Sequence, residues 1–395
     1  MKNKKSYLLI LILLFFSGNP LITFLFGKFS TVVGLTLTIL IIYKSIRFSK
    51  KFIKLIFIIV TGILIIGVFQ HIKLGYVSVL GMINLVIKFL LGGIIINYLK
   101  KQFASIFFKV IADLSLISLM FYLVVNIFGI VIPSITLGPE IESYIIYGTS
   151  TELHMLKNAG MFWEPGAFAG ILTLCLALNY NNLKNYWFEQ PFKLGIIILA
   201  LLTTQSTTGY LVGAIIFLFL LFKGKNIFIV PVFVFAITYI YETTDFLKEK
   251  IEIQIEKSSN QKVGEFSNTR FGSLIFDWYY IQKHPFIGNG LNEKTRYSEH
   301  QYLFVGEKGD AIASGNGFTG YLASLGVFFL IGFFYFLWKA TNRQGLFFAF
   351  IVVLVVLLNL QGEQWFNYPL YLGLPFIILQ KKKNKTSKAK ILIPE

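Results

Sequence analysis

Long apolar runs alternate with short polar connections along most of the chain. A helix needs about 20 consecutive apolar residues to cross the roughly 30 Å hydrocarbon core of a bilayer. An apolar stretch of ambiguous length, Phe192–Phe222, is too long for one upright helix and short for two. The other candidate spans are Tyr7–Phe26, Ser30–Ile46, Lys54–Gln70, Tyr76–Leu99, Phe103–Ile132, Met161–Tyr180, Ile227–Tyr241, Asn316–Trp338, Gly345–Gln361 and Tyr368–Gln380. The pattern predicts an all-α integral membrane protein.

Composition agrees with this pattern. The 395 residues are 55% hydrophobic and 14% charged, whereas soluble domains carry about 25% charged residues. The chain therefore lacks the charges needed to cover two or three soluble domains. Its net charge of +17 would indicate nucleic-acid binding on a soluble protein, but here the position of the charges matters more than their sum, and no nucleic-acid partner is expected.

Basic clusters set the predicted orientation, because cytoplasmic connections are enriched in Lys and Arg. All the clusters fall on the cytoplasmic side only if Phe192–Phe222 crosses twice and turns outside at Ser206–Gly209. This gives about twelve transmembrane helices with both ends inside. The clusters are Lys44–Lys54, Lys100–Lys101, Lys223 with Lys225, Lys339 with Arg343, and Lys381–Lys383.

The same topology divides the chain into four parts. Residues 1–241 hold spans one to nine, 242–315 form a large extracytoplasmic loop, 316–380 hold spans ten to twelve, and 381–395 are a basic cytoplasmic tail. The loop has 11 acidic and 9 basic residues, so it lacks the excess of basic residues found in the rest of the chain. The basic start imitates a signal peptide but lacks a small-x-small cleavage site, so we interpret it as a retained first span. The single Cys175 excludes an intrachain disulfide.

Glu164 precedes Pro165, a residue that favours the first position of a helix. The sixth span should begin there, with Glu164 near its N-cap. Pro165 to Tyr180 is 16 residues, about 24 Å of helix, so Glu164 should lie recessed in the membrane. It either stabilises the helix N-terminus, typically by 0.3–1 kcal/mol, or accepts a proton or binds a sugar.

Two further segments carry polar side chains between spans. In the turn Gln205–Gly209, the hydroxyls of Ser206 and Thr207 either satisfy backbone groups at a broken helix or bind sugar or phosphate oxygens. Asn316 opens span ten within a glycine-rich start, which by itself indicates only a bent helix entry.

The second part of the long loop has helical spacing of apolar residues after the capping side chains Ser267–Thr269. It predicts an amphipathic helix suited to the membrane surface. His284-Pro285 should end this helix, and Gly288-Asn289-Gly290 should form a tight turn. The apolar positions are Phe271, Leu274, Ile275, Trp278 and Ile281.

Arg270 stands at the predicted start of this helix. A guanidinium beside free backbone N–H groups makes an anion site, although a lipid-headgroup anchor or a salt bridge explains an Arg there equally well. The surroundings of Arg296 show no clear period. We find no phosphate-cradling Gly-x-x-x-x-Gly-Lys motif, no Asp-x-Asp pair, no His-Glu-x-x-His and no ligand spacing among the four His. A metal site and a nucleotide or other cofactor are therefore not expected.

These features together resemble the O-antigen polymerase and ligase family of bacterial envelope glycan assembly. Four motifs carry the resemblance, in the family's order, over about residues 155–338. They are Gly160-Met-Phe-Trp-Glu164-Pro165-Gly-Ala-Phe-Ala169, Thr204-Gln-Ser206-Thr207-Thr208-Gly209, Arg270 followed by Pro285-Phe-Ile-Gly288-Asn-Gly290, and the start of the span after the loop. Where ligases have a His before the Asn of that span, this chain has Gly315. Where ligases have an Arg in the turn, it has Thr207. Lys157 stands where polymerases often have an Arg, so the departures favour polymerase.

The resemblance implies a GT-C-like, metal-independent glycosyltransferase in the bacterial cytoplasmic membrane. It would move a growing glycan from undecaprenyl diphosphate onto another lipid-linked repeat unit, on the outer face, for O-antigen, lipopolysaccharide or capsule. Its partners would be the lipid-linked donor and acceptor, membrane lipid, a chain-length regulator and a flippase. Arg270 would bind the diphosphate, with Lys157 and Arg296 as helpers. Glu164 is the preferred base, with Asp310 and His300 as rivals, and Ser206, Thr207 and Asn316 complete the predicted substrate-binding residues.

A ligase-type transferase and a flippase or exporter of lipid-linked glycan are the alternatives. A transporter should line its path with ionisable residues, yet the predicted spans contain few, chiefly Lys88, Lys109 and Asp113. It also has little need of a long outer loop with an amphipathic Arg-bearing helix.

Overall fold

The computed structural model describes residues 2–137, 141–150, 157–223, 270–292, 296 and 316–379, and these are mostly helical. Its helices are α1 (Lys2–Phe15), α2 (Pro20–Phe26), α3 (Ser30–Ile42), α4 (Lys50–Leu74), α5 (Val79–Leu99), α6 (Phe103–Phe121), α7 (Pro165–Leu178), α8 (Leu183–Glu189), α9 (Pro191–Thr203), α10 (Thr207–Lys223), α13 (Arg270–Lys283), α16 (Gly317–Thr341), α17 (Leu346–Gly362) and α18 (Pro369–Gly373).

A small antiparallel sheet corrects the all-α expectation. Its strands are β1 (Ile135–Thr136), β2 (Ile141–Ser143) and β3 (Gly148–Ser150), in the order β1-β2-β3. Ile135 pairs with Ser143, and Ser143 pairs in turn with Gly148. Three strands of two or three residues cannot form a core of their own, so the sheet is a small addition to a helical protein.

Among the described residues, four helical segments are long and apolar enough to cross a membrane, namely Pro20–Ile42, Lys50–Leu74, Val79–Ile127 and Gly317–Gln344. Five shorter apolar helices, α7, α9, α10, α17 and the α18 region, accompany them. Large apolar side chains cover the outer face of α4, where Phe57 is 68% exposed and Ile72 is 67% exposed. An apolar outer surface is suited to lipid rather than water, so we regard the chain as a membrane protein. The count of twelve spans stays a prediction, and the predicted span Ile227–Tyr241 lies outside the described residues.

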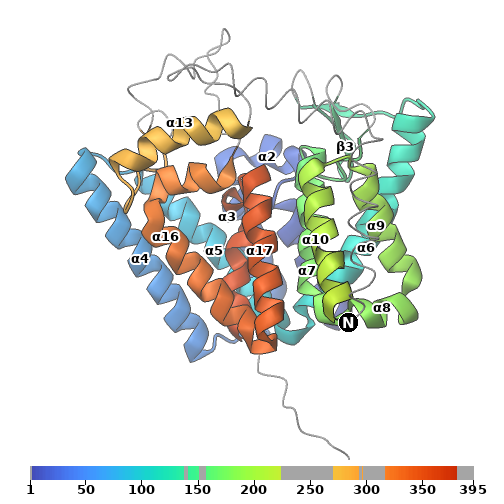
Figure 1. Ribbon diagram of the computed structural model, residues 1–395, viewed down its shortest axis with the longest axis horizontal. Coiled ribbons are helices and arrows are strands. Elements are labelled where there is room, and N and C mark those ends of the chain that lie inside the picture. The colour runs from blue at the N-terminus through green and yellow to red at the C-terminus, as the bar shows by residue number, and fades with distance from the viewer. Residues whose placement is uncertain are drawn as a thin grey trace, which may run out of the picture.

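The bundle has two distinct ends, which we call the α8 end and the α13 end (Figure 1). The N-terminus and α8 lie at one end, and α13 lies across the other. Contacts at the α8 end join the connections that carry the basic clusters. The Asn97 amide donates to the Arg47 carbonyl at 3.5 Å, and the Asn179 amide donates to the Ala104 carbonyl at 3.0 Å. The first contact brings the Lys44–Lys54 and Lys100–Lys101 connections to one end, while the orientation of that end in a membrane stays a prediction.

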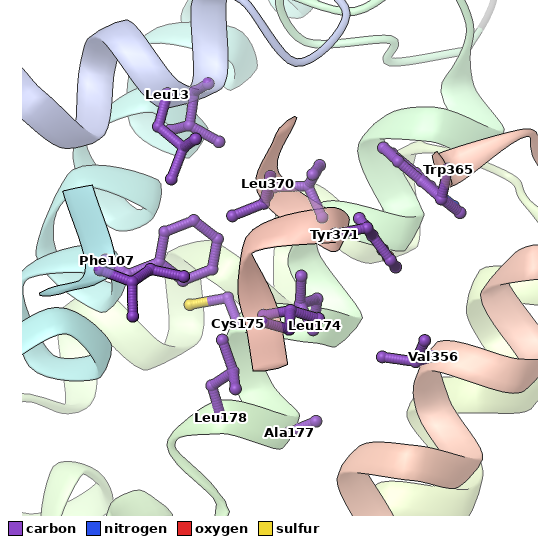
Figure 2. Close-up of a cluster of buried hydrophobic side chains, with 14 of the residues drawn as sticks. Leu13, Phe107, Leu174, Cys175, Ala177, Leu178, Val356, Trp365, Leu370 and Tyr371 are labelled. Carbon is purple, nitrogen blue, oxygen red and sulfur yellow. The ribbon is translucent and has the colours of Figure 1, made fainter. Parts of the chain in front are cut away.

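Helix α7 lies in the centre of the bundle, and nearly all of its residues are buried. Figure 2 shows Cys175 of α7 surrounded by side chains from other helices, among them Leu13 of α1, Phe107 of α6 and Leu370 of α18. The thiol is free and buried. Since α7 is packed on all sides, its N-terminus is held in a fixed position at the α13 end.

Three predicted spans differ in detail. The run Tyr7–Phe26 is broken, because Asn19 accepts the Ile22 N–H at 3.2 Å and starts a separate helix. The helix of Phe103–Ile132 ends early, in a π-helical turn at Tyr122–Ile127. The run Asn316–Trp338 is kinked at Gly326, whose φ is 73°. Phe192–Phe222 does form two helices, α9 and α10, as the charge pattern required.

Candidate functional site at the α13 end

The predicted turn after α13 is present and docks onto the kink of α16. Backbone hydrogen bonds join the two, from Asn289 N–H to the Ala323 carbonyl at 2.7 Å and from Gly290 N–H to the Ser324 carbonyl at 2.9 Å. Gly288 has a φ of 72°, and a Cβ there would lie 2.3 Å from the Ser324 carbonyl carbon. The glycine is therefore required both by its backbone conformation and by close backbone approach. This gives the Pro-x-x-Gly-x-Gly motif a structural role.

Replacing Gly288 by Ala should displace this turn, and Gly75 offers a matched control. Gly75 has nearly the same φ, 74°, but nothing within 4 Å of its added Cβ. Gly75→Ala should cost only the left-handed strain, about 1–2 kcal/mol, while Gly288→Ala should also break the docking hydrogen bonds. Amide hydrogen exchange at Asn289 and Gly290 should accelerate in Gly288→Ala alone. Equal exchange in both variants would contradict the docking role.

Helix α13 packs on the first segment of α16, and Figure 1 shows that segment lying beneath it. The prediction of a helix ending at His284 is confirmed, since α13 runs from Arg270 to Lys283. Its packed face differs from the predicted stripe, because Ile275 and Trp278 are exposed. The packed face consists of Ser273, Phe276, Asp277, Tyr280 and Ile281.

Asp277 is fully buried on this face and was missed by the sequence analysis. Its Oδ2 accepts a hydrogen bond from the Thr319 hydroxyl at 2.7 Å. The sequence did contain a signal for it, because Asp277 is the single acid of the amphipathic segment 270–283 and lies four residues from Ser273, on the same face of the helix. The bond fixes α13, and with it the position of Arg270, relative to the start of α16.

Arg296 is only 6% exposed. Its guanidinium donates to the Ser324 hydroxyl and lies 3.5 Å from the Gly290 carbonyl. The side chain therefore fastens the turn to α16, and binding of substrate by Arg296 stays a prediction.

Glu164 is the N-cap residue of α7, as predicted, with extended backbone angles and Pro165 at the first helical position. Its side chain makes no capping hydrogen bond within the described structure and is half-buried. Helix α7 has 14 residues, about 21 Å, which is shorter than the hydrocarbon core. The carboxylate therefore makes no capping hydrogen bond, while its depth in the membrane and the effect of its charge on the helix N-terminus stay predictions.

Tyr368 lies near both Glu164 and a second carboxylate, Glu363. The Trp163 ring stacks on the Tyr368 ring with centroids 4.7 Å apart. Glu164 and Glu363 both lie close enough to Tyr368 for an electrostatic interaction. Glu363 is 8% exposed and follows directly after α17. The sequence analysis missed Glu363, although an acid at the end of an apolar span was a visible signal.

The junction between α17 and α18, residues 361–368, is where the predicted segments meet. Asn316 caps α16 by accepting the N–H groups of Phe318 and Thr319, both at 3.1 Å, and its amide donates to the Gln361 side chain at 3.0 Å. A Cβ at Gly362 would lie 3.5 Å from Thr208, and one at Gly170 would lie 2.5 Å from the Trp365 ring. Together with the Trp163–Tyr368 stack, these contacts bring three of the four motifs to one junction.

Ser206 caps α10, accepting the Gly209 N–H at 3.2 Å, and is buried, whereas Thr207 is half-buried at the first position of that helix. The hydroxyl of Ser206 thus satisfies a backbone group, as one of the two interpretations held. Lys157 is half-buried, and burial lowers its pKa. His300 and Asp310 lie outside the described residues, as does the side chain of Arg270. Within the described ranges, His, Cys, Asp and Glu form no cluster able to hold a metal ion.

No protein-family model and no curated protein matches the chain. The arrangement is two carboxylates near the stacked rings of Trp163 and Tyr368, with Glu164 at the N-terminus of α7 and Glu363 directly after the C-terminus of α17. Carboxylates suit proton transfer, and aromatic rings suit the apolar faces of sugars.

Proposed function

We propose that the chain polymerises undecaprenyl-diphosphate-linked oligosaccharide repeat units in the bacterial cytoplasmic membrane, building O-antigen or a capsular or exopolysaccharide. One observation carries the proposal. The segments that resemble the polymerase and ligase family, widely separated in sequence, gather at the α13 end. The N-termini of α7, α10 and α16 all reach the 361–368 junction, and the Pro285–Gly290 turn docks on α16.

The reaction requires no cofactor, because the donor sugar already carries an activated leaving group. An acceptor hydroxyl oxygen attacks the anomeric carbon of the donor, and the bond from that carbon to the diphosphate oxygen breaks. Undecaprenyl diphosphate leaves with the bonding electrons, and the hydroxyl proton passes to a carboxylate. We assign this proton to Glu164, and we assign the diphosphate to Arg270 with help from Lys157 and Arg296.

An apolar groove suits the polyprenyl tails of such substrates. A cavity of about 410 Å³ lies between α4 and α16, lined by side chains that include Ile59, Phe69 and Phe333. Ile287, in the docked turn, also lines it. A tail in this groove would therefore have its diphosphate close to the α13 end.

The proposal includes an orientation and partners. The α13 end would face outwards and both termini would lie in the cytoplasm, consistent with the basic connections at the α8 end. A flippase would supply the lipid-linked unit to the outer face, and a chain-length regulator would act on the growing product.

The test is a reconstituted reaction with purified protein and a lipid-linked repeat unit, run with and without lipid A core as a second acceptor. A ladder of products lengthened by whole units is expected. A single transfer to a lipid A core without a ladder would indicate the ligase-type alternative. Faster passage of the unit across vesicle membranes without any new product would indicate a flippase.

A further inference from the structure

A small polar pocket lies between the α2–α3 connection, α5 and the α17–α18 junction. Its volume is about 160 Å³, much more than the roughly 30 Å³ that one water occupies in the liquid. The polar residues that line it are Thr23, Lys28, Ser30, Thr31, Asn84, Lys88, Asn367 and Tyr368.

Lys88 is the notable member, because it lies well inside a membrane helix. It is nine residues from Val79, the first residue of α5, or about 13 Å along the helix. It is half-buried and lines the pocket. A Lys inside a span is costly and usually marks a functional site. Lys109 of α6 differs, since it is exposed and only six residues from the start of its helix at the α8 end.

The positive charges that line the pocket favour the binding of an anion. Lys28 and Lys88 both line it, hydroxyl and amide groups accompany them, and no carboxylate belongs to its lining among the residues that the structure describes. Two larger cavities among the described residues, of about 410 and 480 Å³, are lined almost wholly by apolar side chains. Ammonium and hydroxyl groups are ordinary phosphate ligands.

The residues around the mouth of the pocket indicate that the bound anion is part of a lipid. Lys28 is exposed and lies among exposed apolar side chains of α2 and the following turn. Phe24 is 61% exposed, Leu25 is 59% exposed and Phe29 is 72% exposed. Aromatic and aliphatic groups beside an exposed Lys are typical of the membrane interface, where lipid phosphates lie.

We propose that this pocket binds the phosphate or diphosphate head group of a membrane lipid, with Lys88 at its inner part and Lys28 at its mouth. That the lipid is one of the two polyprenyl-diphosphate substrates rests on the proposed function. Tyr368 would link the two sites, since it lines the pocket and stacks on Trp163 beside Glu164.

Native mass spectrometry of the full-length protein in detergent micelles tests this. The probes are undecaprenyl diphosphate, undecaprenol, phosphatidylglycerol and inorganic diphosphate. Wild type should bind undecaprenyl diphosphate more tightly than undecaprenol, which lacks only the diphosphate. Lys88→Met should weaken binding of a phosphate-bearing lipid by about 10- to 100-fold, and Lys28→Gln should weaken it less.

Lys109→Met is the matched control and should bind every probe as wild type does, while Lys88→Arg should retain most of the affinity. If Lys88→Met weakens the binding of phosphatidylglycerol alone, the pocket is a phospholipid head-group site. If it weakens the binding of undecaprenyl diphosphate, the pocket is a substrate site. Unchanged affinity of folded Lys88→Met for both lipids overturns the proposal, as does an effect on inorganic diphosphate alone. If wild type makes no ladder but Lys88-dependent binding persists, the proposed function fails and the pocket stands. If wild type makes a ladder but lipid binding does not depend on Lys88, the proposed function stands and the pocket proposal fails.

Discussion

Glu164→Gln is expected to reduce ladder formation by about 10²- to 10⁴-fold, the usual contribution of a general base. The amide keeps the size of the side chain but cannot accept the proton of the acceptor hydroxyl. Because the Glu164 side chain makes no capping hydrogen bond to α7 in the described structure, the variant should fold and insert normally. The measurement is the rate of ladder formation at saturating lipid-linked unit, with gel filtration to check folding.

Glu142→Gln is the matched control, because Glu142 is a half-buried carboxylate on β2 and its Oε2 already accepts a bond from Tyr144 at 3.4 Å. It should leave the rate unchanged. Glu363→Gln separates the two carboxylates near Tyr368. A normal ladder from Glu164→Gln together with a large loss in Glu363→Gln would assign the base to Glu363 and remove Glu164 from the mechanism.

Much of the helical framework could be predicted because its causes are local. Apolar length located most of the helices, and Pro165 set the start of α7. Charge distribution required two helices in Phe192–Phe222, and the structure has α9 and α10 there. The turn after α13 was predicted by Pro285 and its glycines, since these residues restrict or permit backbone angles whatever surrounds them.

Features that depend on tertiary contact could not be predicted. Gly326 lies in an apolar run that looks uniform, and its kink is explained only by the Pro285–Gly290 turn, since a Cβ there would lie 2.2 Å from the Phe286 carbonyl oxygen. Asn19, which starts α2, also donates its amide to the carbonyls of Ile145 and Met161. Sequence spacing carries no information on such distant partners.

In the candidate site, too, residues with a local sequence signal could be predicted and residues that depend on tertiary contacts could not. Glu164 was found because its neighbour is a proline, and Asn316 because glycines surround it. Glu363 and Asp277 were missed, because a single acid in an apolar segment does not indicate which partner it has in the fold. Asp277 accepts a hydrogen bond from Thr319, which lies on a different helix, and Glu363 interacts with Tyr368, whose ring stacks on the distant Trp163.

Arg270→Ala is expected to lower ladder formation by about 10²- to 10³-fold, the typical effect of removing one group that stabilises developing charge. Arg270 is the first residue of α13, where free backbone N–H groups favour an anion. Asp277, seven residues further on, ties this helix to α16 through Thr319. The helix should therefore stay in position when the guanidinium is removed, and the loss should appear in the rate rather than in the amount of folded protein.

Lys283→Ala gives the matched control, because Lys283 is the basic residue at the other end of α13, with its ammonium 4.4 Å from the Tyr279 ring centroid. Its removal should leave the ladder intact. Arg270→Lys keeps the positive charge but loses the planar pair of donors that suits a diphosphate, so it should recover only part of the rate. A full ladder from Arg270→Ala would exclude Arg270 from diphosphate binding. Equal losses in Arg270→Ala and Lys283→Ala would instead show that α13 acts through its position alone, because only a direct contact with the leaving group distinguishes the two ends of the helix.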